Sequence, residues 1–224
     1  MATRPDPSGE ARTPLTRERV LRTAITLADQ SGIASLSMRK LAQALGVEAM
    51  SLYNHVAKKD DLLNGMVDLV FGEIGLPPEG VDWKTAMRQR AISARAVLTR
   101  HPWAIGLMES RSRPGPSTLR HHNAVIGCLR EAGFSIAMAA HAFSLIDSYI
   151  YGFAQQQISL PFQSPKEVAG MAEGFLRQFP AEAYPHLAEL TLQHVLKPGY
   201  DYAHEFEFGL DLILDGLERV RDTA

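Results

Sequence analysis

The chain has a single cysteine, Cys128, so an intramolecular disulfide is excluded and a reducing, cytoplasmic location is expected. Residues 1–14 are polar and proline-rich and have no apolar core segment, which argues against a secretory signal and predicts a disordered tail. No stretch approaches the roughly 18 uninterrupted apolar residues that a membrane-spanning helix requires. We therefore expect no membrane partner.

Sequence signatures of catalysis and of metal binding are also missing. The G-x-S-x-G, P-loop and G-x-G-x-x-G motifs are all absent. Among the eight histidines, His121 and His122 are adjacent, and neither has a His, Cys, Asp or Glu four residues further on. We therefore expect no catalytic residue, no metal and no cofactor.

The charge is divided unevenly along the chain. Residues 1–59 carry nine Lys or Arg against five Asp or Glu, a balance of +4. Residues 60–224 carry fourteen against twenty, a balance of −6. This division favours a small anion-facing module joined to a separate acidic body.

All strong periodicities are helical and no alternating run is bounded by hairpin turns, so we expect an all-α fold. The segment LPPEG at 76–80 breaks the helical pattern and marks a domain junction. We predict a helix-turn-helix head with a linking helix over 15–75, and a larger helical ligand-binding and dimerisation body over 80–222. In the body, helices are expected at 83–100, 103–110, 116–132, 135–158, 166–178, 183–196 and 202–221.

The head is predicted to contain three helices before the linking helix. Its first two helices have an N-cap and a closing glycine each, namely Thr16 with Gly32 and Ser37 with Gly46. A third helix is expected over 48–55, and the linking helix starts at residue 60 or 61. Two short helices joined by a glycine turn expose the second one, as in a helix-turn-helix. An ordinary helical hairpin has the same periodicity.

The third helix has an outer face suited to DNA. Leu52 and Val56 can turn inward, which leaves small and hydrogen-bonding residues outside: Ala49, Met50, Ser51, Tyr53 and Asn54. Such residues suit entry into a major groove, whereas a merely solvated face would be rich in Glu and Lys.

These residues also carry a family resemblance. The run LSMRKLAQALGVEAMSLYNHVAKKDDLL over 36–63 resembles the DNA-binding domain of TetR-family transcriptional regulators, including its LYxHV element. Four segments of the body resemble the tetracycline-repressor type of C-terminal domain: HPW at 101–103, GFS at 133–135, SYIYGF at 148–153 and EFEFGLDLILDGLE at 205–218. The resemblance covers about residues 13–222.

The resemblance implies which residues contact a double-stranded DNA operator. The positions that match base-reading or phosphate-contacting ones are Arg39, Ala49, Met50, Ser51, Tyr53, His55 and Lys59. Phosphate contacts fix the register of the protein on DNA, while base contacts specify the sequence. Ala49 and Met50 stand where the tetracycline repressor has a polar residue and a proline, so we expect a different operator. The sequence leaves open whether Tyr53 also packs in the head and whether Lys59 is only solvated.

Two helices of the body predict a homodimer. The last helix carries apolar residues at spacings of three and four, which suits packing of near-parallel helices. The helix over 135–158 is apolar nearly all round, so it must be covered on two sides. In the family these two helices form a four-helix bundle with a second subunit. The interface is predicted to include Phe143, Ile150, Phe206, Leu210, Ile213 and Leu217, unless both stripes pack within one chain.

The resemblance further implies a small-molecule effector that binds the body and moves the heads through the linking helix. An apolar wall with few polar groups is typical of such a cavity. The candidate lining residues are Trp103, Leu107, Met108, His122, Phe143, Asp147, Tyr151 and Gln155, each of which also fits plain core. Glu109 falls near the position of the repressor's metal-ligating histidine, and this departure argues against tetracycline with magnesium.

Taken together, the sequence predicts a ligand-responsive transcriptional regulator, most often a repressor in this family. It would bind a palindromic operator as a homodimer and be released by an effector. Two alternatives remain open. One is a small-molecule carrier or helical enzyme without specific DNA binding, and the other is a regulator without an effector.

Overall fold

The computed structural model describes residues 14–108, 110–111, 113–162, 165–179 and 181–221, so nearly all of the predicted tail, and Glu109, lie outside the described residues. Every regular element in these ranges is helical, which confirms the all-α prediction. The elements are α1 (Arg17–Ser31), the 3-10 turn η1 (Ile33–Ser35), α2 (Met38–Leu45), α3 (Ala49–Leu52), α4 (Lys59–Glu73), α5 (Trp83–Arg100), α6 (Pro102–Met108), α7 (Pro116–Glu131), α8 (Ile136–Ser159), α9 (Pro165–Gln178), α10 (Pro185–Leu190), the π turn η2 (Thr191–Val195) and α11 (Tyr202–Arg221). None of the described helices is long and apolar enough to cross a membrane.

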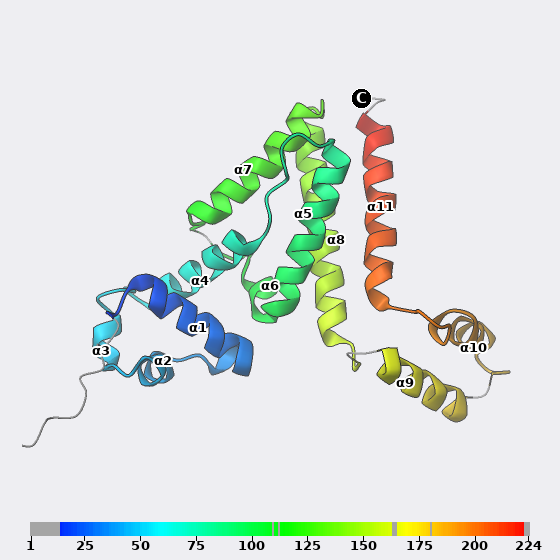
Figure 1. Ribbon diagram of the computed structural model, residues 1–224, viewed down its shortest axis with the longest axis horizontal. Helices are drawn as coiled ribbons and strands as arrows, with labels where there is room; N and C mark the ends of the chain where they lie inside the picture. The colour runs from blue at the N-terminus through cyan, green and yellow to red at the C-terminus, as the bar shows by residue number, and fades with distance from the viewer. Residues whose placement is uncertain (1–13, 109, 112, 163–164, 180, 222–224) are drawn as a thin grey trace, which may run out of the picture.

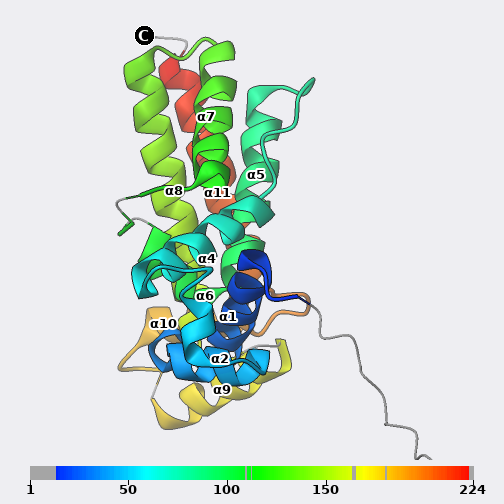
Figure 2. The same ribbon diagram turned by 90° about the vertical axis from the view of Figure 1, so that its left-hand side faces the viewer.

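The helices form a head and a body that share one helix. In Figure 1, α1, α2 and α3 make up the head, and α4 runs from the head into the body. The long helices α5, α7, α8 and α11 form the body, and α9 and α10 extend from it on the side away from the head. Figure 2, in which the head faces the viewer, shows α4 and α6 between the head and the long helices.

The ends of the first two helices are fixed by the capping residues that the sequence predicts. The Thr16 hydroxyl accepts a hydrogen bond from the Arg19 amide at 3.2 Å, and the Ser37 hydroxyl accepts one from the Lys40 amide at 3.2 Å. Gly46 ends α2 in the left-handed region with φ 67°, which glycine adopts without steric cost. The turn between α2 and α3 is therefore encoded locally.

Several predicted helix boundaries are wrong. The third helix, expected over 48–55, is the single turn α3, because the following backbone is held by other groups of the head (below). The linking helix begins one residue before the predicted start, at Lys59. The helix expected at 103–110 begins at Pro102, a residue well suited to a first helical position, and ends at Met108. The helix expected at 183–196 is divided into α10 and η2.

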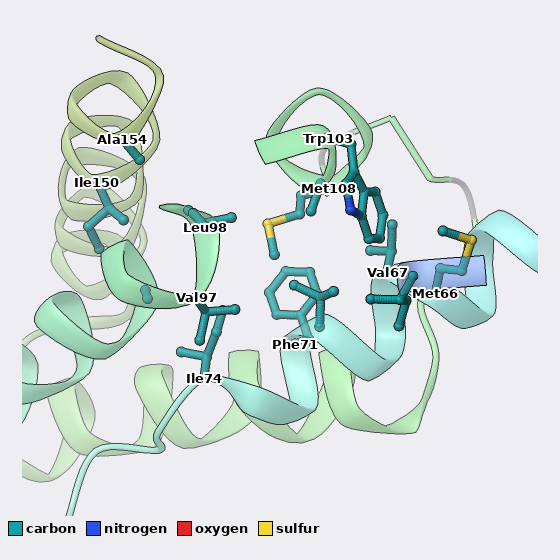
Figure 3. Packing of buried hydrophobic residues seen from close by; sticks show 14 of the residues in the cluster. Met66, Val67, Phe71, Ile74, Val97, Leu98, Trp103, Met108, Ile150 and Ala154 are labelled. Atoms are coloured by element: carbon teal, nitrogen blue, oxygen red, sulfur yellow. The ribbon is translucent and has the colours of Figure 1, made fainter. Parts of the chain in front are cut away.

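One continuous hydrophobic core joins head and body through α4. The cluster of buried side chains extends from Val20 in α1 to Leu217 in α11. Figure 3 shows Val67 and Phe71 of α4, and Ile74 directly after it, among residues of α5 and α6. Because burial of such side chains stabilises the fold by roughly 1.5–3 kcal/mol each, α4 is bound firmly on both sides.

The predicted dimer stripe requires a correction. The side chains of Ile150, Phe206, Leu210 and Leu217 are all buried within the single chain, where α11 packs against α5 and α8. A side chain that its own chain already covers has no surface left for a partner. A spacing of three and four shows that a helix has an apolar side but does not tell which neighbour covers it. Phe143 and Ile213 are half-buried.

The body contains a buried polar cluster. Arg90, which is 1% exposed, forms an ion pair with Asp147 of α8 and donates from Nε to His121 Nε2 of α7 at 3.1 Å. Burial, together with the charges of Arg90 and His122, lowers the pKa of His121 to about 3. The imidazole is therefore neutral at pH 7 and can accept the guanidinium hydrogen bond. The cluster ties three helices of the body together.

Replacing Asp147 by alanine should lower the free energy of unfolding by about 3–5 kcal/mol, because the Arg90 guanidinium then stays buried without its carboxylate. Urea-induced unfolding followed by circular dichroism measures the change. Glu18→Ala is the matched control, since the Glu18–Arg22 pair at 2.9 Å is exposed on α1. That control should cost less than about 1 kcal/mol. Similar losses in the two variants would contradict the prediction.

Candidate DNA-binding surface and effector cavity

The single-turn helix α3 (Ala49–Leu52), which we call the reading turn, is buried on one side and exposed on the other. Leu52 and Val56 are buried, at 0% and 1% exposure, and they fix the turn on the head. Ala49, Met50 and Tyr53 are exposed, Met50 to 72% of its surface. The side chains at the start of the turn are therefore accessible to a binding partner. Tyr53 is exposed to 45% and is not a core residue.

Arg17 holds the segment that follows the reading turn. Its guanidinium donates to the His55 carbonyl at 2.7 Å and to both carboxylate oxygens of Asp61, at 2.7 and 3.0 Å. Asp61 also accepts from the Ala57 amide at 3.0 Å. The hydrogen bond from Arg17 holds the pKa of the Asp61 carboxyl below its usual value. This network fixes the backbone after α3 in a turn, which is why the helix ends early.

The remaining predicted DNA contacts lie around the reading turn. Arg39 is exposed in α2, Lys59 is exposed at the first position of α4, and Ser51 and His55 are half-buried. These residues come from four consecutive segments of one head. Exposed cationic and hydrogen-bonding groups beside a protruding turn are the arrangement that phosphate contacts require.

A polar joint fastens the head to the body. His101 Nδ1 lies 2.8 Å from Asp29 Oδ1 at the end of α1, and its Nε2 lies 3.2 Å from Glu73 Oε2 at the end of α4. Trp103 donates from Nε1 to the same Asp29 oxygen at 2.7 Å, and Arg100 donates to Glu73 at 2.8 Å. The orientation of the head is therefore set by specific contacts as well as by the shared core.

A cavity of about 160 Å³ lies where α4 meets α7. Its described walls include Asn64 and Val67 of α4, Met108 of α6, and Thr118 and His122 of α7. An adjoining groove of about 870 Å³ shares Asn64 with it and extends along the head. Among the described residues, no group of three or more His, Cys, Asp or Glu side chains could hold a metal ion.

The predicted pocket residues separate into two groups in the structure. Met108 and His122 line the cavity, and the His122 ring lies edge-on to Phe143 with 5.2 Å between centroids. The others are engaged elsewhere. Trp103 belongs to the joint, Asp147 pairs with Arg90, the Tyr151 hydroxyl donates to Asp147 at 3.4 Å, Gln155 is exposed beside Ser159, and Leu107 is half-buried against the core.

Sequence reasoning missed the residues that position the reading turn and the head. Arg17 is 44 residues from Asp61, and His101 is 72 residues from Asp29. No spacing rule connects partners so far apart. The only local signal is that charged residues stand at helix ends, where such residues are common in any protein.

A head that presents an exposed turn, fastened by one helix to a body with a cavity, defines a DNA-binding regulator of the helix-turn-helix class. Comparison with known families agrees. The family model described as "Bacterial regulatory proteins, tetR family" matches residues 20–66, and that described as "Tetracyclin repressor-like, C-terminal domain" matches residues 76–221. The chain belongs to the tetR family and is a ligand-responsive DNA-binding transcriptional regulator.

Relatives extend over nearly the whole chain. An HTH-type transcriptional regulator of Saccharopolyspora erythraea is 33% identical over 215 residues, which cover 96% of this chain and 89% of that protein. The HTH-type transcriptional repressor DrrR1 of Streptomyces coeruleorubidus is 33% identical, with 95% and 80% covered. The structure of ActR from Streptomyces coelicolor in complex with actinorhodin has a TM-score of 0.74 at 30% identity, covering 93% of this chain and 99% of that chain.

Replacing Lys59 by alanine should weaken DNA binding by a similar factor for all sequences, because we expect an exposed ammonium at this position to contact phosphates and to read no base. The slope of log affinity against log salt concentration should become flatter by about one unit. Fluorescence anisotropy with labelled duplexes over a range of salt concentrations measures both effects. Lys166→Ala, which removes an exposed lysine from α9, is the control. An unchanged slope in Lys59→Ala would remove Lys59 from the phosphate contacts.

Proposed function

We propose that this protein is a cytoplasmic repressor that binds a palindromic operator as a homodimer and is released by a small-molecule effector. The observation that carries the proposal is that α4 follows directly after the exposed turn α3 in the head and also lines a cavity of about 160 Å³ in the body. DrrR1, a relative, is named a repressor, and ActR is known in complex with a small molecule. The proposed role needs no catalytic residue, metal or cofactor.

The reading turn supports major-groove recognition. We infer that Ala49, Met50 and Ser51 face base edges, because they stand in the first turn of α3, where Ala49 and Met50 are exposed and Ser51 is half-buried. Arg39, Tyr53, His55 and Lys59 surround this turn and supply donors for the phosphates. Met50 is apolar and 72% exposed, which suits contact with a thymine methyl group.

The outer surfaces of α8 and α11 support a homodimer. Asp147 is the one charged residue of α8, and it is buried, so the exposed side of this 24-residue helix has no Asp, Glu, Lys or Arg. Small residues, including Ala140 and Ser144, lie exposed on that side and allow a second helix to approach closely. On α11, Phe208 is 66% exposed and Leu212 is 54% exposed. We infer that these surfaces, rather than the predicted stripe, meet the same helices of a second subunit.

The cavity between α4 and α7 supports effector binding beside the helix that connects the head to the body. Val67 and Met108 give it an apolar wall, Asn64, Thr118 and His122 supply polar groups, and Arg111 and Arg113 add two positive charges. A ligand there lies against α4, the helix that carries the head. An effector releases the operator only if it binds the released state better than the DNA-bound state.

Selection of bound duplexes from random DNA at near-physiological salt tests the proposed function. A palindromic consensus is expected, with half-sites about one helical turn, roughly 34–36 Å, apart. Tyr53→Ala should lose this consensus, because the phenol no longer fixes the register. Recovery of no consensus by the wild-type protein would argue for a carrier or an enzyme instead.

Replacing Leu212 by glutamate should convert the dimer into a folded monomer, because it places a charge in the apolar contact between subunits. Light scattering after size exclusion measures the mass, and circular dichroism checks the fold. Leu119→Glu is the matched control, since Leu119 is 55% exposed on α7. A wild-type monomer, or a Leu212→Glu variant that stays dimeric, would overturn the proposed interface.

A further inference from the structure

The first turn of α7 is capped by a residue from another helix. Its N-cap, Gly115, has no side chain, and the amide hydrogens of a first helical turn need acceptors from outside the helix. Asp68 of α4 supplies one. Its Oδ1 accepts from the Thr118 amide at 2.9 Å and from the Thr118 hydroxyl at 3.0 Å. A carboxylate at this position also interacts favourably with the helix dipole.

Gly115 makes this contact possible by leaving space. A Cβ at this position would lie 2.3 Å from Asp68 Cγ, far closer than any real contact. The backbone there has φ −85° and ψ 178°, a conformation open to every residue, so glycine at this position leaves space for the Asp68 carboxylate and is not needed for its conformational freedom. Gly72, one turn after Asp68, gives a second close approach, since its Cβ would lie 3.4 Å from Ser117 Oγ.

The same contact borders the cavity. Gly115 and Thr118 belong to the cavity wall, and Asn64, also in the wall, lies one turn before Asp68 on α4. A ligand that widens the cavity between Asn64 and Thr118 would separate α4 from the first turn of α7. The hydrogen bonds of Asp68 are what this separation breaks.

We propose that Asp68, Gly115 and Thr118 form a clamp that holds α4 in the position from which the head binds DNA. The proposal rests on the function proposed above and deepens it. Asp68 is a positioning residue, because it acts through α4. Loss of the clamp lets α4 and the attached head vary in orientation, so two heads of a dimer reach both half-sites less often. Opening of the clamp is then the step by which an occupied cavity lowers operator affinity.

Four variants of the full chain test the clamp: Gly115→Ala, Asp68→Ala, the double variant and Asp68→Asn. Operator affinity without effector should fall about tenfold in Gly115→Ala and in Asp68→Ala, within the range typical of allosteric coupling. The double variant should bind no more weakly than Asp68→Ala, because the added methyl group then has no carboxylate to displace. Asp68→Asn keeps an acceptor oxygen and should stay within about threefold of wild type.

Gly127→Ala is the matched control. Gly127 lies inside α7, and nothing is within 4 Å of its Cβ position. This variant should leave operator affinity unchanged. Thermal unfolding of each variant separates a purely structural cap from the clamp, since a structural cap would lower the melting temperature without changing the affinity of the folded protein.

The orientation of the head gives a readout that needs no operator. Spin labels at Met50→Cys and Ile126→Cys, in a Cys128→Ser background diluted with unlabelled protein, report the distance between head and body. Gly115→Ala should broaden the distance distribution, and Gly127→Ala should leave it unchanged. An unchanged distribution or unchanged affinity in Gly115→Ala, or additive effects in the double variant, would overturn the clamp. Failure of the wild-type protein to select an operator would instead overturn the proposed function.

Discussion

The structure depends on one helix, α4, whose two halves pack in the head part and in the body part of the same hydrophobic core. The first half of α4 packs in the head, where Leu62 and Met66 are buried, and its second half packs in the body through Val70 and Phe71. A rigid helix that is buried at both ends cannot move at one end without moving at the other, because protein interiors are close-packed. A displacement of α4 within the body is therefore transmitted to the head.

Two sets of polar contacts fix the orientation of α4 relative to the head and the body. The joint of Asp29, His101 and Glu73 holds the end of α4 and the end of α1, while Asp68 holds the middle of α4 against α7. Apolar packing resists separation but tolerates small rotations, whereas a hydrogen bond requires a narrow range of angles. The shared core thus provides strength, and the polar contacts define one orientation of the head.

Features encoded by neighbouring residues could be predicted from the sequence. The caps at Thr16 and Ser37 and the glycine turn at Gly46 depend on residues within a few positions of one another, and all three are present. The resemblance adds the prediction that the residues in and around α3 contact DNA. Contacts between distant segments could not be predicted, since Arg17 and Asp61, or Asp68 and Thr118, are brought together only by tertiary packing. The predicted dimer contacts on α11 were wrong for the same reason. Periodicity shows that one side of a helix is apolar, but it does not show whether that side is covered by the same chain or by a second subunit.

In and around the reading turn, the residues that hold the fold are different from the residues that project outward, and this separation has an evolutionary consequence. Leu52 anchors the turn, and Arg17 with Asp61 holds the backbone behind it, while Ala49 and Met50 project without supporting either. Substitutions at the projecting positions therefore leave the fold intact, and surface changes of this kind usually alter stability by less than about 0.5 kcal/mol. With the base-reading role proposed for these positions, gene duplicates of such a protein would acquire new target sequences by changing two or three side chains, while the scaffold is inherited unchanged.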